Sequence, residues 1–234
     1  VHCTGCTVCA HTTNKVSHSH NRPAMTIALV GNPNCGKTAF FNAACGGHER
    51  TGNYAGVTVS SVEGRTNYDG QCLRIVDLPG TYSLSAFSPE EAFVANELTK
   101  GEVDVIINVL DVTNLERNLL LTLQLQKTGI PIVGALNMYD ELENSNSHIK
   151  LDELSKRLGM PLIPTVARSG RGINDALAAA VALKEQTRLA VGNQRQMFQT
   201  VTEKNPLSPH TRIHNLIEGV YELRESKAAR LSEK

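Results

Sequence analysis

The stretch Gly31-Asn32-Pro33-Asn34-Cys35-Gly36-Lys37-Thr38 decides the fold of this 234-residue chain. It has the spacing of a phosphate-binding loop and lies between an apolar run at 26–30 and a helical pattern at 37–45. The ordinary alternative is a Gly-rich turn, but the pattern arises by accident in roughly one chain in a hundred of this length. We therefore expect the backbone from Gly31 to Ala39 to bind phosphates, Lys37 to bridge the terminal phosphates and Thr38 to ligate magnesium.

Short β-branched runs alternate with helix-length apolar patterns on both sides of this loop. Strands are expected at 26–30, 57–63, 73–76, 103–110, 131–136 and 162–166. Helices are expected at 37–45, 89–100, 115–128, 151–158 and 173–185. This alternation predicts an α/β fold with a six-stranded, mostly parallel sheet and helices on both faces.

Composition divides the chain into a Cys/His-rich tail at 1–24, a main domain at 25–185 and a small helical domain at 186–234. After residue 185 the strands are expected to stop, and a buried helical stripe is expected at Ile213, Leu216, Ile217, Val220 and Leu223. The 23 basic and 23 acidic residues cancel, which disfavours nucleic acid as a partner. No apolar run is long enough to cross a bilayer and no secretory signal is recognisable, so a cytosolic location is expected.

A second motif, Asp77-Leu78-Pro79-Gly80, ends the strand at 73–76. Beside a phosphate loop, an acid at this place holds magnesium through water, and the Gly80 NH can bond the terminal phosphate. A further magnesium ligand is expected from Thr58 in Gly56-Val57-Thr58, within a segment that responds to the nucleotide. A threonine in a strand is usually only a strand residue, but its order among the other motifs favours a ligand.

A third motif, Asn137-Met138-Tyr139-Asp140, ends the strand at 131–136 and predicts which base is bound. The Asp140 carboxylate can accept both the ring NH and the exocyclic amine of guanine, whereas adenine offers no such donor pair. GTP or GDP is therefore expected rather than an adenine nucleotide. The segment Val166-Ala167-Arg168 fits the loop whose backbone contacts the guanine oxygen. Alone, the Asn137 motif would be a simple turn.

The amino-terminal tail carries soft metal ligands at Cys3, Cys6, Cys9 and His11. Thiolate and imidazole suit zinc or iron, although the spacing is not that of a common zinc site and a reduced tail without metal is the alternative. The remaining cysteines are scattered through the body of the chain, and no structural disulfide is expected.

These motifs resemble the amino-terminal GTPase domain of the bacterial ferrous iron transport protein B family. The likeness runs from about residue 26 to 185 and rests most on DLPGTYSLS at 77–85 and DVTNLERNL at 111–119, whereas GNPNCGKT would fit any GTPase. It implies a Ras-like phosphate-loop fold followed by a helical regulatory domain. It also implies a membrane-embedded iron-permease region of the same polypeptide as partner, at the cytoplasmic face of the bacterial inner membrane. Homo-oligomerisation is left open.

The resemblance also implies a mechanism of hydrolysis. Thr81 and Tyr82 stand where Ras-type enzymes place a water-positioning glutamine, so slow intrinsic turnover is expected. Asn34 matches the position at which some members bind potassium, which would offset charge near the leaving phosphate. The expected catalytic set is Lys37, Asn34, Thr58 and Gly80. The rival functions are a soluble GTPase of ribosome assembly or tRNA modification, and a metal-binding sensor of guanine nucleotides without useful turnover.

Overall fold

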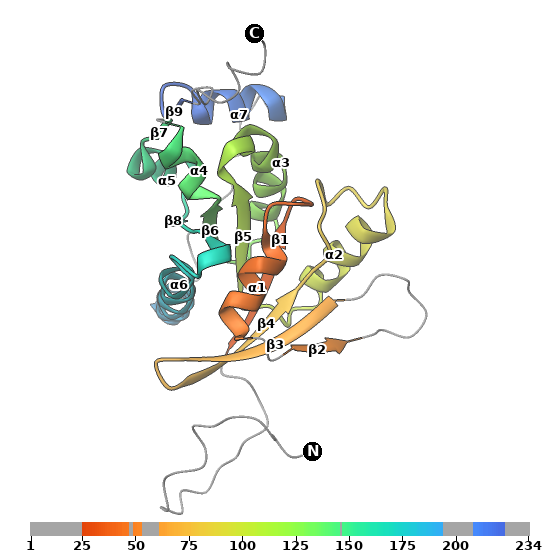
Figure 1. The fold of residues 1–234 in the computed structure, drawn as a ribbon. Coiled ribbons are helices and arrows are strands. Elements are labelled where there is room, and N and C mark those ends of the chain that lie inside the picture. The colour runs from red at the N-terminus through yellow and green to blue at the C-terminus, as the bar shows by residue number, and fades with distance from the viewer. Residues whose placement is uncertain (1–24, 47–48, 53–60, 146, 194–207, 223–234) are drawn as a thin grey trace, which may run out of the picture.

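The computed structural model describes residues 25–46, 49–52, 61–145, 147–193 and 208–222. Seven strands form one sheet in the order β2-β3-β4-β1-β5-β6-β8 (Figure 1). The strands of this sheet are β1 (Met25–Gly31), β2 (Glu49–Gly52), β3 (Ser61–Tyr68), β4 (Gln71–Asp77), β5 (Val105–Asp111), β6 (Ile132–Asn137) and β8 (Leu162–Pro164). From β4 to β8 all neighbours run parallel, and β3 pairs antiparallel with β4 and with β2.

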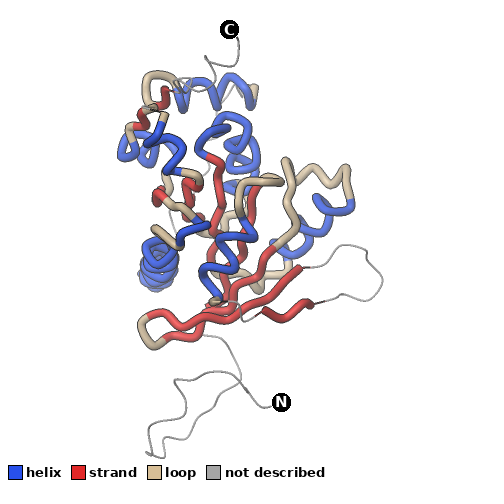
Figure 2. Tube along the Cα trace, viewed as in Figure 1, coloured by secondary structure: helices blue, strands red, loops and turns tan. Residues whose placement is uncertain are grey.

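The predicted fold class is confirmed, with β2 as an additional short strand at the sheet edge. The helices are α1 (Lys37–Cys45), α2 (Pro89–Thr99), α3 (Leu115–Gln126), α4 (Tyr139–Asn144), α5 (Leu151–Leu158), α6 (Ile173–Asn193) and α7 (Pro209–Ile217). Two single 3-10 turns, η2 (Val112–Asn114) and η3 (Ala167–Ser169), follow the ends of β5 and β8. Figure 2 shows the β3–β4 hairpin extending beyond the helical layers.

Two hydrophobic layers cover the two faces of the sheet. Ile27 and Leu29 of β1 pack in the layer that contains α1 and α6, while Ala28 and Val30 pack in the layer that contains α2, α3, α5 and α7. Side chains of a strand alternate between faces, and a central parallel strand buries both. This explains why β1 is buried along its whole length. The loop that follows β1 therefore begins at the end of a buried strand.

Helix α7 is attached to the main domain by both apolar and polar contacts. Ile213, Ile217 and Val220 are buried in the core layer shared with α3 and α5. The Arg157 guanidinium donates to the carbonyl oxygens of residues 215, 216 and 218 at 3.1, 3.2 and 2.9 Å, where a helix carboxyl end favours a cation. The Tyr221 hydroxyl donates to the carbonyl of Val112 at 2.6 Å. Leu223, predicted on the same stripe, lies outside the described residues.

Several elements differ from the sequence-based expectations. Strands do not stop after residue 185, because β9 (Tyr221–Glu222) pairs antiparallel with β7 (His148–Ile149). Helix α6 continues to Asn193, since nothing between 185 and 193 opposes a helix before Gly192. Strand β8 ends at Pro164, and Val166 instead forms one bridge with Arg171. Among the described helices, none is both long and apolar enough to span a bilayer.

Candidate nucleotide-binding site

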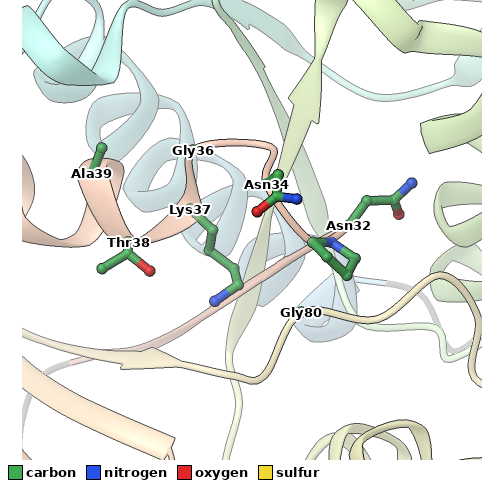
Figure 3. A pocket seen from close by; sticks show the side chains of 8 residues that line it. Asn32, Asn34, Gly36, Lys37, Thr38, Ala39 and Gly80 are labelled. Carbon is green, nitrogen blue, oxygen red and sulfur yellow. The ribbon is translucent and has the colours of Figure 1, made fainter.

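The predicted motifs gather at the edge of the sheet where the parallel strands end. Ligands of open α/β sheets bind at this edge, outside the carboxyl ends of the strands. The loop after β1 encloses a pocket of about 470 Å³ (Figure 3). Its lining consists of Asn32, Pro33, Asn34, Gly36, Lys37, Thr38, Ala39 and Gly80. The phosphate loop and the DLPG motif, predicted separately, therefore form one site.

The phosphate loop is held in its shape by left-handed residues and close packing. Asn34 has φ 66° and Gly36 has φ 85°, a backbone region that only Gly adopts without cost. A Cβ on Gly36 would meet the Asn137 amide nitrogen at 2.1 Å, and one on Gly31 would meet the Val109 carbonyl oxygen at 2.5 Å. Cys35 is buried inside the loop, and burial raises the pKa of its thiol to about 11. Cys35 and Cys72 are free thiols.

Lys37 and Asp77 form a buried ion pair at the floor of the site. Lys37 Nζ contacts Asp77 Oδ1, and their side chains are 10% and 8% exposed. Burying two charges is costly unless they are paired, so this contact fixes the lysine at the start of α1 and the carboxylate at the end of β4. Figure 3 shows the Lys37 ammonium reaching toward the segment that carries Gly80, with the Thr38 hydroxyl on the same side of the helix start.

The segment after Asp77 packs directly on the phosphate loop. A Cβ on Gly80 would lie 3.1 Å from Pro33 Cα, so the glycine permits this close approach. The Thr81 NH donates to the Gly31 carbonyl at 3.2 Å. Tyr82 stacks on the Arg117 guanidinium at 4.3 Å from the ring centroid.

Arg117 stands at the start of α3, and sequence reasoning gave it no role. Its carbonyl oxygen accepts from the Asn32 amide at 3.4 Å. Its side chain also lines a second hollow, of about 470 Å³, together with His210, Ile213 and Tyr221 from the α7 segment. Arg117 therefore contacts Tyr82, in the segment after Gly80, and also lines the hollow beside α7.

Asn137 joins the phosphate loop to the predicted base-binding loops. It is 3% exposed, its Nδ2 donates to the Cys35 carbonyl at 2.8 Å, and its Oδ1 accepts from the Ala167 NH at 2.9 Å. Sequence reasoning placed Asn137 against the base and missed this bridge. The chain order of the three motifs indicated that they belong to one site, but nothing at Asn137 itself indicated that its side chain connects them.

The other residues predicted to read the base lie in α4 and at η3. Asp140 lies in the first turn of α4, preceded by Met138 with φ 60°. Its Oδ2 contacts the Arg168 guanidinium. Three residues further along the chain in each case, Glu143 of α4 and Arg171 of the loop after η3 form a second ion pair at 2.9 Å. The Tyr139 NH donates to the Thr165 carbonyl at 3.2 Å, so α4 and the loop after β8 are joined at three places.

Asp111 explains part of the DVTNLERNL motif. Its carboxylate accepts from the Thr113 NH and hydroxyl at 2.8 and 2.6 Å, and the Asp111 NH donates to Asn118 Oδ1 at 3.2 Å. This network shapes the turn between β5 and α3, the helix whose first turn carries Arg117.

Some predicted ligands lie outside the described residues. These are Gly56, Val57 and Thr58, and the tail residues Cys3, Cys6, Cys9 and His11. Within the described residues, no group of three or more His, Cys, Asp or Glu side chains could hold a metal ion. The predicted magnesium ligands that the structure describes are Thr38 and Asp77.

Comparisons with known proteins agree with this geometry. The sequence profile of the family "Ferrous iron transport protein B" matches residues 25–180. The Fe(2+) transport protein A/Fe(2+) transporter FeoB fusion protein of Porphyromonas gingivalis is 41% identical over 87% of this chain and 24% of its own length. Fe(2+) transporter FeoB of Escherichia coli K12 is 49% identical over 67% of this chain and 21% of its own length. The chain thus spans about a quarter or less of these relatives.

Solved structures give the same assignment. A mutant of S. thermophilus NFeoB bound to GDP has a TM-score of 0.65 and 45% identity, covering 68% of this chain and 61% of its own. The cytosolic domain of the T. maritima FeoB iron transporter in a GMPPNP form has a TM-score of 0.69 and 34% identity, covering 77% and 69%. With the family profile spanning all three predicted nucleotide motifs and the sheet that carries them, the chain belongs to the ferrous iron transport protein B family as its amino-terminal G domain.

Proposed function

We propose that this chain binds and hydrolyses GTP as the cytoplasmic switch domain of a bacterial ferrous iron transporter. The observation that carries the proposal is the bridge through Asn137, which joins the phosphate loop at Cys35 to the base-reading loop at Ala167. The Asn137 side chain thus connects the loop that lines the phosphate pocket with the loop beside Asp140, the carboxylate suited to guanine. The relatives bound to GDP or in a GMPPNP form support nucleotide binding at the same place.

The described residues fit a magnesium ion. Magnesium takes hard oxygen ligands and is commonly held by one or two protein groups together with substrate phosphates. Thr38 supplies a hydroxyl and Asp77 a carboxylate, with Thr58 proposed as a further ligand. When bound, the ion would neutralise charge on the phosphates. Lys37 would do so from the start of α1, where the helix dipole and free NH groups also favour an anion.

Intrinsic turnover is proposed to be slow. Thr81 is 3% exposed and its hydroxyl donates to the Ser83 carbonyl at 2.7 Å, while the Tyr82 ring lies on Arg117. Both side chains are thus engaged in contacts of their own, and neither is among the residues that line the pocket. Potassium held by Asn34 would supply the missing positive charge. Phosphate release should be faster in potassium than in sodium, and Asn34→Ala should abolish the difference; a variant with full potassium stimulation would refute this role.

The segment 186–234 is proposed as the regulatory domain that relays the nucleotide state to a membrane-embedded permease region of the same polypeptide. Its described part consists of residues 186–193 at the end of α6 and residues 208–222, which include α7 and β9. Helix α7 packs in the same core layer as α3 and α5 through Ile213 and Ile217. This location would place the chain at the cytoplasmic face of the inner membrane. We also propose that the tail cysteines and His11 bind zinc or iron, to be tested by elemental analysis of anaerobically purified protein.

Titration calorimetry with GTP and ATP tests the central proposal. A site that hydrogen-bonds the two donors of guanine should reject a base that lacks these donors by about 10⁴-fold. ATP should therefore bind at least a hundred times more weakly than GTP. Asp140→Asn should remove most of this preference without unfolding the protein, because Asp140 is partly exposed. Equal binding of ATP and GTP by the unaltered chain would refute the assignment.

A further inference from the structure

Arg168 contacts the carboxylate that reads the base. The residue stands in η3, immediately after Ala167, and its Nη2 contacts Asp140 Oδ2 across 28 positions of sequence. The Arg168 side chain is 75% exposed, whereas the Asp140 side chain is 19% exposed. The carboxylate is thus mostly covered and the guanidinium is mostly in water.

The guanidinium and the guanine base present the same chemistry to a carboxylate. Arginine offers planar N–H donors in a fork that matches a carboxylate. The ring NH and exocyclic amine of guanine are likewise two parallel donors on one planar nitrogen–carbon–nitrogen unit. This inference rests on the proposed function, in which Asp140 selects guanine. The base would then need both oxygens of the Asp140 carboxylate, and Arg168 contacts one of them, Oδ2.

We propose that Arg168 competes with guanine for Asp140 and thereby sets the affinity of the site for guanine nucleotides. In the absence of nucleotide, Arg168 holds the Asp140 carboxylate in place and neutralises it. When the base enters, the guanidinium moves into water, at low cost because it is already three-quarters exposed. The price is a weaker nucleotide complex and faster release than the same pocket would give without this arginine.

The opposite role would be a supporting one, in which Arg168 stays on Asp140 and orients it for the base. The two roles predict changes of opposite sign when the arginine is removed. Competition predicts tighter binding by Arg168→Ala, whereas support predicts weaker binding.

The chain supplies a matched control in Arg171. Its ion pair with Glu143, at 2.9 Å, joins α4 to the same loop, three residues further along the chain on each side. Both members are about half exposed, and neither contacts Asp140 through any ion pair described for this structure. Arg171→Ala therefore removes the same charge and a similar link between α4 and the loop, but leaves the base-reading carboxylate unaltered.

The experiment measures GDP affinity by titration calorimetry on the full chain, for the unaltered protein, Arg168→Ala and Arg171→Ala. Exposed ion pairs are weak, so Arg168→Ala should tighten GDP binding by about two- to fivefold at low salt. The gain should shrink at about 1 M salt, where charges are screened within about 3 Å. Arg171→Ala should bind as the unaltered protein does, and urea unfolding would verify that both variants are folded.

Two further measurements show whether a negative result counts against the competition by Arg168 or against the proposed function itself. In an Asp140→Asn background, Arg168→Ala should no longer change GDP affinity, because the shared acceptor charge is gone. If the unaltered chain shows no preference for GDP over ADP, the proposed function itself fails. If that preference is present but Arg168→Ala leaves GDP binding unchanged or weakens it, only the competition is overturned.

Discussion

Replacing Asn137 by Ala should destabilise the protein even when no nucleotide is present. The side chain is buried and makes two hydrogen bonds, to the Cys35 carbonyl at 2.8 Å and from the Ala167 NH at 2.9 Å. Each buried group left without a partner costs about 1–3 kcal/mol. The expected loss is therefore about 2–6 kcal/mol, a large part of the roughly 5–15 kcal/mol that stabilises a typical domain.

The assay is urea unfolding of the nucleotide-free protein, with circular dichroism as the readout. Asn144→Ala is the control: Asn144 is exposed at the end of α4, and such surface changes cost within about 0.5 kcal/mol. Asn137→Asp separates the contributions of the two hydrogen bonds. It keeps an acceptor for the Ala167 NH but places an oxygen against the Cys35 carbonyl. It should also be destabilised. A loss below about 1 kcal/mol for Asn137→Ala, together with weaker GDP binding, would refute the bridge and leave Asn137 as a base contact alone.

Two further predictions concern Cys35 and Tyr221. Burial raises the pKa of Cys35 from 9.0 to about 11, so the stabilisation it contributes is complete below pH 9 and is lost as the pH rises toward 11. Iodoacetamide at neutral pH should modify the exposed Cys72 well before Cys35, as followed by peptide mass mapping; equal rates would contradict the burial. Tyr221→Phe removes the hydroxyl bonded to the Val112 carbonyl and should cost about 0.5–1.5 kcal/mol in urea unfolding, whereas no loss would mean that α7 is not docked in solution.

The main sheet and most helices could be predicted because their signals are local. The bounds of α1 and α5 are those expected from periodicity. Ser88 is also a local signal, because it caps α2 by accepting from the Glu91 NH at 3.2 Å. β2 was missed because its four residues carry no apolar alternation and its pairing comes from β3. α4 was missed because six residues are too few for a helical period, and β9 because two residues pair only through contact with β7.

The site was predictable as a set of motifs but not as a network. The spacing of Lys37 and Asp77 within their own motifs predicted both roles, and the structure places them in contact. Arg168 was expected to contribute backbone only, and nothing local in the sequence relates its side chain to Asp140, 28 residues earlier. The left-handed backbone at Asn34 and Met138 was equally hidden, because residues other than Gly adopt it only where the surrounding fold requires it.

The weakness of the stacking between Tyr82 and Arg117 limits how much energy this one contact can pass from the segment after Gly80 toward α7. Tyr82 is 40% exposed, and a cation–π contact at an exposed site is worth about 0.5–1 kcal/mol. A relay that passes through this single contact can shift a conformational balance by about fivefold at most. An all-or-none change at α7 would have to draw its energy from several such contacts acting together.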